Sequence, residues 1–204
     1  MKIDSIKLKS KKSLTEFNVI ANGEVFLIHS DVIAKYGLTT NLELAEKIFK
    51  EYVLESEYLF CLNKATNYIN TKLKTTKQLK DYLYLKGFKS NTINKVIEKL
   101  NEYKILNDEY FAEVFIRSNQ NKLSKKSIEN KLVSKGVKKE VYHSQIEEID
   151  DKNLCIEVSK KFMKNKENTK QNFEKLTRHL QYKGFGYDAI SASLKALKYD
   201  EDFY

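Results

Sequence analysis

Positive charge recurs at regular intervals along this sequence. Lysine and arginine gather in three segments, residues 72–99, 117–139 and 160–183, and each segment holds eight basic side chains against no more than two acidic ones. Clustered ammonium groups attract phosphate backbones without regard to base sequence, and they also attract acidic protein surfaces. The chemistry that this pattern predicts is therefore the binding of a polyanion or of an acidic protein.

Catalytic chemistry has no comparable pattern. The histidines His29, His143 and His179 stand far apart in the sequence, and the usual motifs of a phosphate-binding loop, a serine nucleophile or a zinc protease do not occur. Cys61 and Cys155 lack a second cysteine or histidine at metal-ligand spacing. We therefore expect no enzyme activity, no catalytic residues, no metal and no cofactor. Two isolated thiols are typical of a reducing compartment, so we expect a cytoplasmic protein.

The composition fits a folded protein with a positive surface. The 204 residues carry 37 basic and 28 acidic side chains, which gives a formal net charge of +9, and 41% of the residues are hydrophobic. No apolar run approaches the roughly 18 residues that a membrane helix needs, and no apolar stretch near the start resembles a signal peptide. We therefore expect no membrane partner.

A motif of lysine, glycine and an apolar residue marks an internal repeat. Its glycines, Gly87, Gly136 and Gly184, follow one another at spacings of 49 and 48 residues. Aliphatic residues stand eight and four positions before each glycine, and twelve positions before it stands a residue that favours helix N-caps, namely Thr75, Ser124 or Asn172. Each repeat thus predicts a capped helix that ends at a left-handed glycine, followed by a second amphipathic helix.

A further helical stretch precedes each of these pairs, at residues 56–70, 108–119 and 151–164. The repeat is therefore a unit of three helices, and three stacked units are about the minimum for a stable array. We predict a mainly α fold, with three tandem three-helix repeats in an elongated, curved array. The predicted domains are an N-terminal extension and three repeats, with bounds 1–55, 56–106, 107–150 and 151–204.

The N-terminal extension has a different pattern. Residues 14–20 and 24–28 flank Ala21-Asn22-Gly23, and Asn-Gly between two such runs indicates a β-hairpin with a type I′ turn. Residues 2–9 alternate between apolar and polar side chains. Ser30 or Asp31 is a candidate cap for a short helix that ends at Gly37. We expect a small β-hairpin element before the helical repeats.

Two helices joined by a short turn also form the frame of helix-turn-helix proteins that read DNA bases. The second helices, however, offer different polar residues for base reading: Asn91, Asn94, Lys95 and Lys99 in the first repeat, Tyr142, His143 and Gln145 in the second, and Ser191 and Ser193 in the third. Because the repeats do not share a base-reading set, we favour a structural use of the motif.

Three segments together resemble the regulatory protein RecX family. They are LNDEYFAEVFI at residues 106–116, IENKLVSKGV at residues 128–137 and HLQYKGF at residues 179–185. The hairpin followed by DVIAKYGL at residues 31–38 is similar to the extension found in relatives from low-GC Gram-positive bacteria. Together these segments extend over nearly the whole chain, and their order and spacing make the resemblance specific. The resemblance implies a fold of tandem three-helix repeats, in agreement with the internal repeat.

The resemblance also implies a partner and an activity. Members of the family bind the RecA recombinase, chiefly in the helical groove of the RecA–DNA filament, and limit its ATP hydrolysis and strand exchange; some bind DNA directly. We expect a monomer that contacts acidic RecA surface or the phosphates of single-stranded or duplex DNA. The alternative is a nonspecific DNA-binding repeat protein that acts on recombination indirectly. The expected contact residues are Arg117, Lys122, Lys125, Lys126, Lys131 and Lys135, with Lys86 and Lys183 as their equivalents in the other repeats.

Overall fold

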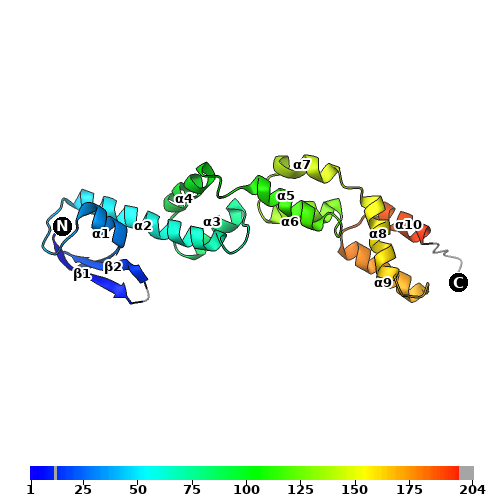
Figure 1. Ribbon diagram of the computed structural model, residues 1–204, viewed down its shortest axis with the longest axis horizontal. Helices are drawn as coiled ribbons and strands as arrows, with labels where there is room; N and C mark the ends of the chain where they lie inside the picture. The colour runs from blue at the N-terminus through cyan, green and yellow to red at the C-terminus, as the bar shows by residue number, and fades with distance from the viewer. Residues whose placement is uncertain (12, 198–204) are drawn as a thin grey trace. The chain divides into compact units, whose positions relative to one another are not determined.

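The computed structural model describes residues 1–11 and 13–197, so the last seven residues of the predicted third repeat lie outside it. Within the described ranges the chain forms three strands followed by ten helices (Figure 1). The chain divides into two compact units. The first unit comprises residues 1–74 and 78–106, and the second comprises residues 75–77 together with the chain from residue 107 onward.

The first unit begins with an antiparallel sheet of three strands, β1 (Ile3–Ser10), β2 (Ser13–Ala21) and β3 (Glu24–His29), in the order β1-β2-β3. Asn22 and Gly23 have φ angles of 49° and 80°, as the predicted turn requires. The sheet has one strand more than the predicted hairpin, because the alternating segment at residues 2–9 pairs with β2.

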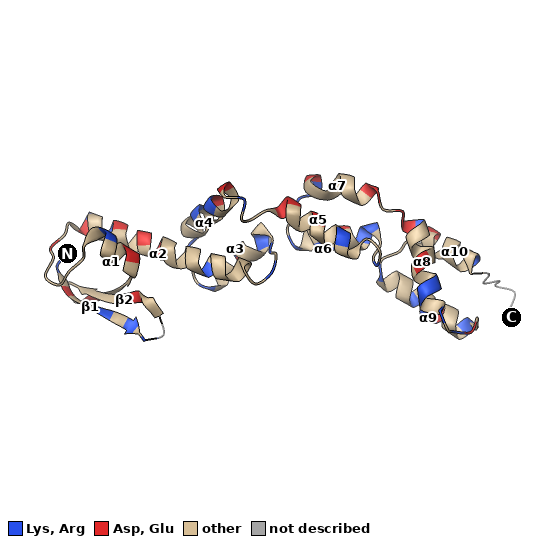
Figure 2. Ribbon diagram, in the orientation of Figure 1, with Lys and Arg blue, Asp and Glu red and all other residues tan. Residues whose placement is uncertain are grey.

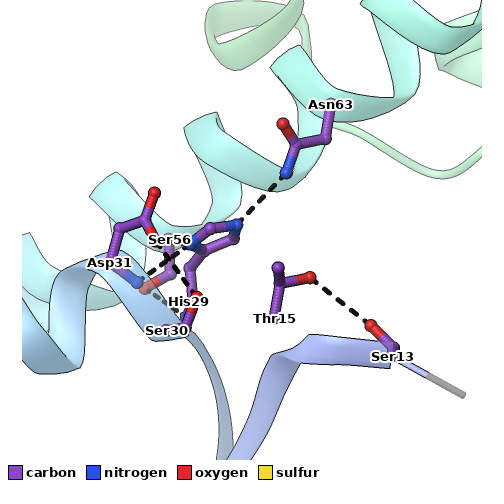
Figure 3. A network of polar contacts seen from close by, with 7 residues as sticks. All are labelled: Ser13, Thr15, His29, Ser30, Asp31, Ser56 and Asn63. Carbon is purple, nitrogen blue, oxygen red and sulfur yellow. Dashed lines mark hydrogen bonds and ion pairs between the residues drawn. The ribbon is translucent and has the colours of Figure 1, made fainter.

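Helix α1 (Ser30–Tyr36) ends at Gly37, which has a φ of 59°, as the sequence predicts. The predicted caps Ser30 and Asp31 are wrong, because the imidazole of His29 performs this role. Its Nδ1 accepts a hydrogen bond of 3.1 Å from the backbone N–H of Asp31 (Figure 3). An aromatic ring acts here as the oxygen of a serine or aspartate does at most N-caps.

His29 also connects the sheet to the long helix α2 (Glu46–Ile69). Its backbone N–H donates to Ser56 Oγ at 3.1 Å, and its Nε2 lies 3.1 Å from the side-chain amide of Asn63 (Figure 3). The ring also packs against Phe60, with 5.1 Å between the ring centroids. Because the buried imidazole has partners on both nitrogens, it can stay buried without an unpaired polar atom.

Helix α2 starts ten residues earlier than the predicted stretch at 56–70 and passes without a break through the predicted boundary between residues 55 and 56. No glycine or proline interrupts residues 46–69. With α3 (Thr76–Leu85) and α4 (Ser90–Glu102) it forms the first repeat. The predicted aliphatic positions are buried there: Leu79, Leu83 and Ile93 are fully enclosed.

The second unit contains two further repeats. The middle repeat consists of α5 (Asp108–Asn119), α6 (Lys125–Ser134) and α7 (Lys139–Glu147), and the third consists of α8 (Asp151–Met163), α9 (Lys170–Tyr182) and α10 (Tyr187–Ala196). In each repeat the first helix packs against the third. The second helix contributes the predicted aliphatic pair, and all four side chains are fully buried: Ile128, Leu132, Leu176 and Leu180.

The predicted helix caps of the second unit are confirmed in one case and wrong in the other. Ser124 caps α6, since its Oγ accepts from the backbone N–H of Ser127 at 3.2 Å. Asn172 lies inside α9, and Thr169 caps that helix instead by accepting from the N–H of Asn172. Helix α9 therefore starts about one turn earlier than its counterpart α6.

The start of the second helix of the middle repeat, α6, is held by the repeat that follows. Ser124 Oγ donates to the carbonyl oxygen of Gly184 at 2.7 Å, and the backbone N–H of Lys125 donates to Asp151 Oδ1 at 2.8 Å. The orphan backbone N–H of Lys125 is thus satisfied by the carboxylate at the start of the third repeat's first helix, and the hydroxyl of the cap Ser124 by a carbonyl at its glycine turn.

The same arrangement recurs one repeat earlier. Residues 75–77, which begin α3, group with the second unit. Thr75 Oγ1 donates to the carbonyl oxygen of Lys135 at 2.6 Å, and the backbone N–H of Thr76 donates to Asp108 Oδ1 at 2.8 Å. We call this pairing of a helix start with the next glycine turn and its acid the repeat junction.

Replacement of Gly184 by alanine tests the repeat junction. Gly184 and Gly87 have φ angles of 86° and 85°, so alanine introduces the same backbone strain of about 1 kcal/mol at both positions. A methyl group at Gly184 would lie 2.8 Å from Ser124 Oγ, whereas nothing lies within 4 Å of that point at Gly87. We expect Gly184→Ala to lower the unfolding free energy by about 1 kcal/mol more than Gly87→Ala, as measured by urea unfolding; equal losses would contradict the close contact.

His179 should make stability depend on pH. Burial lowers the pKa of its imidazole below the ordinary value of 6.5, with help from the nearby Lys183 and Lys166. As the pH falls, the unfolded chain binds a proton at this ring before the folded state does. The contribution of His179 to the unfolding free energy should therefore be fully present above pH 6.5 and be lost as the pH falls toward the lowered pKa of the folded state. In His179→Gln this loss should be smaller in urea unfolding at several pH values. An unchanged slope would refute the contribution.

Candidate interaction surface

Four of the expected contact residues are available to a partner. Arg117 lies in the last turn of α5, Lys122 in the following loop, and Lys126 and Lys131 on α6. All four are exposed, and no ion pair with any of them occurs within the described residues. Figure 2 shows basic residues on α6. We call these four side chains the free cations of the middle repeat.

The free cations do not form a single row. Lys126 and Lys131 are five residues apart, which is about 140° around a helix of 3.6 residues per turn. The fully buried residues Ile128 and Leu132 define the core face of α6. Lys126 therefore lies opposite the core, and Lys131 lies on one flank. A partner that contacts both must cover a broad part of the surface of α6.

Three other expected contact residues make contacts inside the second unit. Lys125 Nζ donates to the carbonyl oxygen of Glu147 at 2.9 Å, and Lys183 Nζ donates to that of Lys122 at 3.1 Å. Lys135 Nζ lies 5.8 Å from the ring centroid of Phe115. These side chains are partly buried. Each of them therefore makes a contact within the second unit, which charge counting along the sequence did not predict.

Lys86, in the first unit, belongs to a stack of lysines and tyrosines. Its Nζ lies 5.4 Å from the ring centroid of Tyr82, Tyr82 stacks on Tyr68 with 4.0 Å between centroids, and Lys74 Nζ lies 4.7 Å from Tyr68. Cation–π contacts of this kind hold a lysine in place without neutralising its charge. Residues 68 and 82 lie on different helices, so no helical periodicity in the sequence could have paired them.

The pKa values of two adjacent carboxylates at the start of α8, Asp150 and Asp151, are shifted in opposite directions. The backbone N–H of Asn153 holds the pKa of Asp150 below its ordinary range, because it stabilises the ionised carboxylate that caps α8. Burial raises the pKa of Asp151, the acid of the repeat junction, although it accepts the N–H of Lys125.

The sequence analysis did not identify the junction acids Asp108 and Asp151. A signal for them does exist. Asp108 and Asp151 each stand four residues before a small side chain that is fully buried, Ala112 and Cys155 respectively. Small buried residues at this offset indicate where the first helix of a repeat packs most closely, and the acid then lies one turn earlier.

The histidines have separate surroundings. His29 is buried at the cap of α1, the ring of His179 packs 4.8 Å from that of Phe162, and His143 is exposed with its Nδ1 3.9 Å from Glu147. Cys61 and Cys155 are free and buried, and burial raises the pKa of the Cys61 thiol to about 12. Across residues 1–11 and 13–197, no group of three or more acidic, histidine or cysteine side chains could hold a metal ion, and no helix is long and apolar enough to span a membrane.

Comparison with known proteins gives matches along the chain. A family model described as the first three-helix domain of RecX matches residues 61–100, and one described as its third three-helix domain matches residues 148–194. Regulatory protein RecX of Clostridium perfringens (strain SM101 / Type A) is 32% identical over 208 residues, which is 98% of each chain. Regulatory protein RecX of Caldanaerobacter subterraneus is 30% identical over 189 residues, 92% of this chain and 95% of that protein.

Solved structures share the fold. A crystal structure of regulatory protein RecX superposes with a TM-score of 0.65 at 16% identity and covers 95% of this chain and 98% of its own. RecX from Lactobacillus salivarius gives a TM-score of 0.58 at 24% identity over 70% of this chain and 97% of that chain. The mainly helical fold with its small N-terminal sheet agrees with these neighbours. Because relatives that are at least 30% identical match this chain over nearly its full length, the chain belongs to the family of regulatory proteins RecX.

Proposed function

We propose that this protein regulates the RecA recombinase by binding in the groove of the RecA–DNA filament, where it lowers ATP hydrolysis and strand exchange. The observation that carries the proposal is the identity of 32% to a regulatory protein RecX over 98% of both chains. We further propose that the protein acts as a monomer in the cytoplasm, without catalytic chemistry or a cofactor, and that its three repeats are separate structural domains after the N-terminal extension.

The free cations of the middle repeat supply the proposed contact. Because these four side chains form no ion pair within the described residues, a carboxylate or phosphate can approach them without breaking an existing contact. An exposed ion pair contributes only about 0–1 kcal/mol, so several must act together. Lys125, Lys135 and Lys183 would add positive potential from their positions in the second unit and help to steer an acidic partner, and Lys86 would do so from the first unit.

Regulation by binding alone requires a preference between two states of the partner. A bound protein can shift an equilibrium only by the difference between its affinities for the two states. The proposed regulator must therefore bind a less active filament more tightly than an active one. A surface of several weak contacts suits this requirement, because a change in the spacing of neighbouring RecA subunits would alter many contacts together.

Nonspecific DNA binding is the second candidate function. It is favoured by the same free cations, since lysine and arginine that lack protein partners are also suited to phosphate. In that case the protein would compete with RecA for DNA, and its effect on recombination would be indirect. The two candidates differ in whether the amount of DNA or the amount of RecA filament determines the response.

Charge reversal of the free lysines should weaken regulation of RecA. We expect Lys122→Glu, Lys126→Glu and Lys131→Glu, combined in one variant, to raise the concentration needed for half-inhibition of RecA ATP hydrolysis on single-stranded DNA by about tenfold or more. Lys125 is left unchanged because its Nζ is bound to Glu147. The measurement is a steady-state ATPase titration with DNA in excess over the regulator.

A matched control separates the surface from the net charge. Lys7→Glu, Lys11→Glu and Lys47→Glu change the same number of charges on exposed lysines of the N-terminal extension. This variant should inhibit RecA like the unaltered protein. If both triple variants lose inhibition equally, or if neither does, the assignment of the contact to the middle repeat is wrong.

Salt dependence distinguishes direct DNA binding from binding to the recombinase. If the four free cations neutralise four phosphates, the logarithm of the DNA association constant should fall with the logarithm of salt concentration with a slope of about −4 on duplex DNA and about −3 on single strands. Fluorescence anisotropy of a labelled oligonucleotide measures this slope. A flat dependence, or no binding without RecA, would remove the second candidate function.

A further inference from the structure

Each repeat junction of the second unit has the same chemistry. The glycine turn provides a backbone carbonyl, and an acid at the start of the first helix provides a carboxylate. The occupant is the start of a helix, which brings a serine or threonine hydroxyl and a free backbone N–H. The contacts are 2.6 and 2.8 Å at Lys135 and Asp108, and 2.7 and 2.8 Å at Gly184 and Asp151.

The first repeat has a glycine turn and an acid at the matching positions, although its first helix α2 begins eleven residues before that acid. Its glycine turn is at Gly87, whose φ of 85° matches the 80° and 86° of its counterparts. Its acid is Glu57, because Glu57 stands four residues before the fully buried Cys61, just as Asp108 and Asp151 precede Ala112 and Cys155. The register of the packed helices therefore assigns Glu57 to the position of the junction acid.

These acceptors of the first repeat border an open cleft. Gly87 and Glu57 both line a cleft of about 820 Å³, which is also bordered by α2 and by the strand residues of the sheet. Nothing lies within 4 Å of the point where a side chain would begin at Gly87, whereas Lys77 and Ser124 crowd the counterparts Gly136 and Gly184. One carboxylate oxygen of Glu57 accepts from Thr92 at 2.9 Å, and the other can accept from a further donor.

We propose that this cleft binds the N-terminal end of a helix of another protein. The occupant begins with serine or threonine, whose hydroxyl donates to a carbonyl of the Gly87 turn, and its first free backbone N–H donates to Glu57. The two junctions within the second unit define this chemistry, because each holds such a helix start between the same two acceptors. The inference concerns the first unit and does not depend on which protein supplies the helix.

The charge of the cleft determines the first turn of the occupant. Lys64, Lys86 and Lys89 line the cleft without ion pairs within the described residues, while Lys9 is paired with Glu16 at 2.8 Å. Acidic residues are the ones that helix N-termini favour, and here they would also face three lysines. The proposed partner helix therefore carries aspartate or glutamate directly after its serine or threonine cap.

A second copy of this chain fits less well. The helix start that it could offer is that of α9, the second helix of the third repeat, which Thr169 caps and in which Lys170 follows the cap. A lysine there would approach the lysines of the cleft and be repelled. Helix α9 also begins about one turn earlier than α6 relative to the glycine turn that follows it. Charge and length therefore favour a different, acidic protein as the source of the helix.

Titration with a helical peptide tests the proposal. The probe is a peptide of about 15 residues that begins Ser-Glu-Glu and is held helical by a side-chain cross-link, since a free helix of that length is marginal in water. The readout is the backbone amide signal of each glycine in the full-length, ¹⁵N-labelled protein, which contains six glycines. We expect the Gly87 signal to shift on addition of the peptide, and the Gly136 and Gly184 signals to stay in place because their turns are occupied.

Two controls identify the contacts. A peptide with alanine in place of its serine cap should bind about fivefold more weakly. Lys89→Glu should weaken binding of the acidic peptide, whereas Lys138→Glu should not. The two lysines are equivalent, since both are exposed and both directly precede the third helix of a repeat.

Several results would overturn the proposal. It is wrong if the Gly87 signal does not move at millimolar peptide, if serine-capped and alanine-capped peptides bind equally well, or if Lys89→Glu and Lys138→Glu have the same effect. A single-stranded oligonucleotide that shifts Gly87 when the peptide does not would assign the cleft to nucleic acid. Self-association in sedimentation that Lys170→Glu abolishes would assign it to a second copy.

Discussion

The repeat architecture depends on one constraint: the start of a buried helix needs hydrogen-bond acceptors from outside that helix. The first backbone N–H groups of a helix have no acceptor within the helix, and they must find one elsewhere when they are buried. The backbone N–H of Ser124 donates to the carbonyl oxygen of Lys183, and that of Lys125 donates to the carboxylate of Asp151, both in the next repeat. A close approach of this kind leaves no room for a side chain at Gly184. The glycine therefore terminates one helix and receives the start of another.

Much of this fold could be predicted because local features determine it. The aliphatic pair at Leu132 and Ile128, the left-handed glycine after it and the Asn22-Gly23 turn all follow from short-range periodicity and backbone preference, and the structure confirms them. The cap of α1 could not be predicted, because the imidazole of His29 acts there only by virtue of its burial between α1 and α2. Likewise, the alternating pattern of residues 2–9 did not show that β1 pairs with β2, because that pairing depends on contacts across the chain.

The exposure and the contacts of the basic side chains were less predictable than the fold. Counting charges along the sequence locates a basic segment but does not show which lysines are already in use. Lys125 and Lys183 bind backbone carbonyls within the second unit, whereas Lys122 and Lys126 are exposed. The same distinction applies to acids: Asp151 satisfies a helix start and is not part of a charged patch. We propose that the function of this protein lies in charged groups that make no contact within the fold.

Chemical footprinting of lysines tests the central claim most directly. The full-length protein would be treated with an amine-reactive reagent alone and when bound to RecA filaments on single-stranded DNA, and the modified residues identified by mass spectrometry. We expect the filament to protect Lys122, Lys126 and Lys131, while Lys7, Lys11 and Lys47 react as before. Unchanged reactivity of the three middle-repeat lysines in the bound protein would contradict the proposal that this surface meets the recombinase.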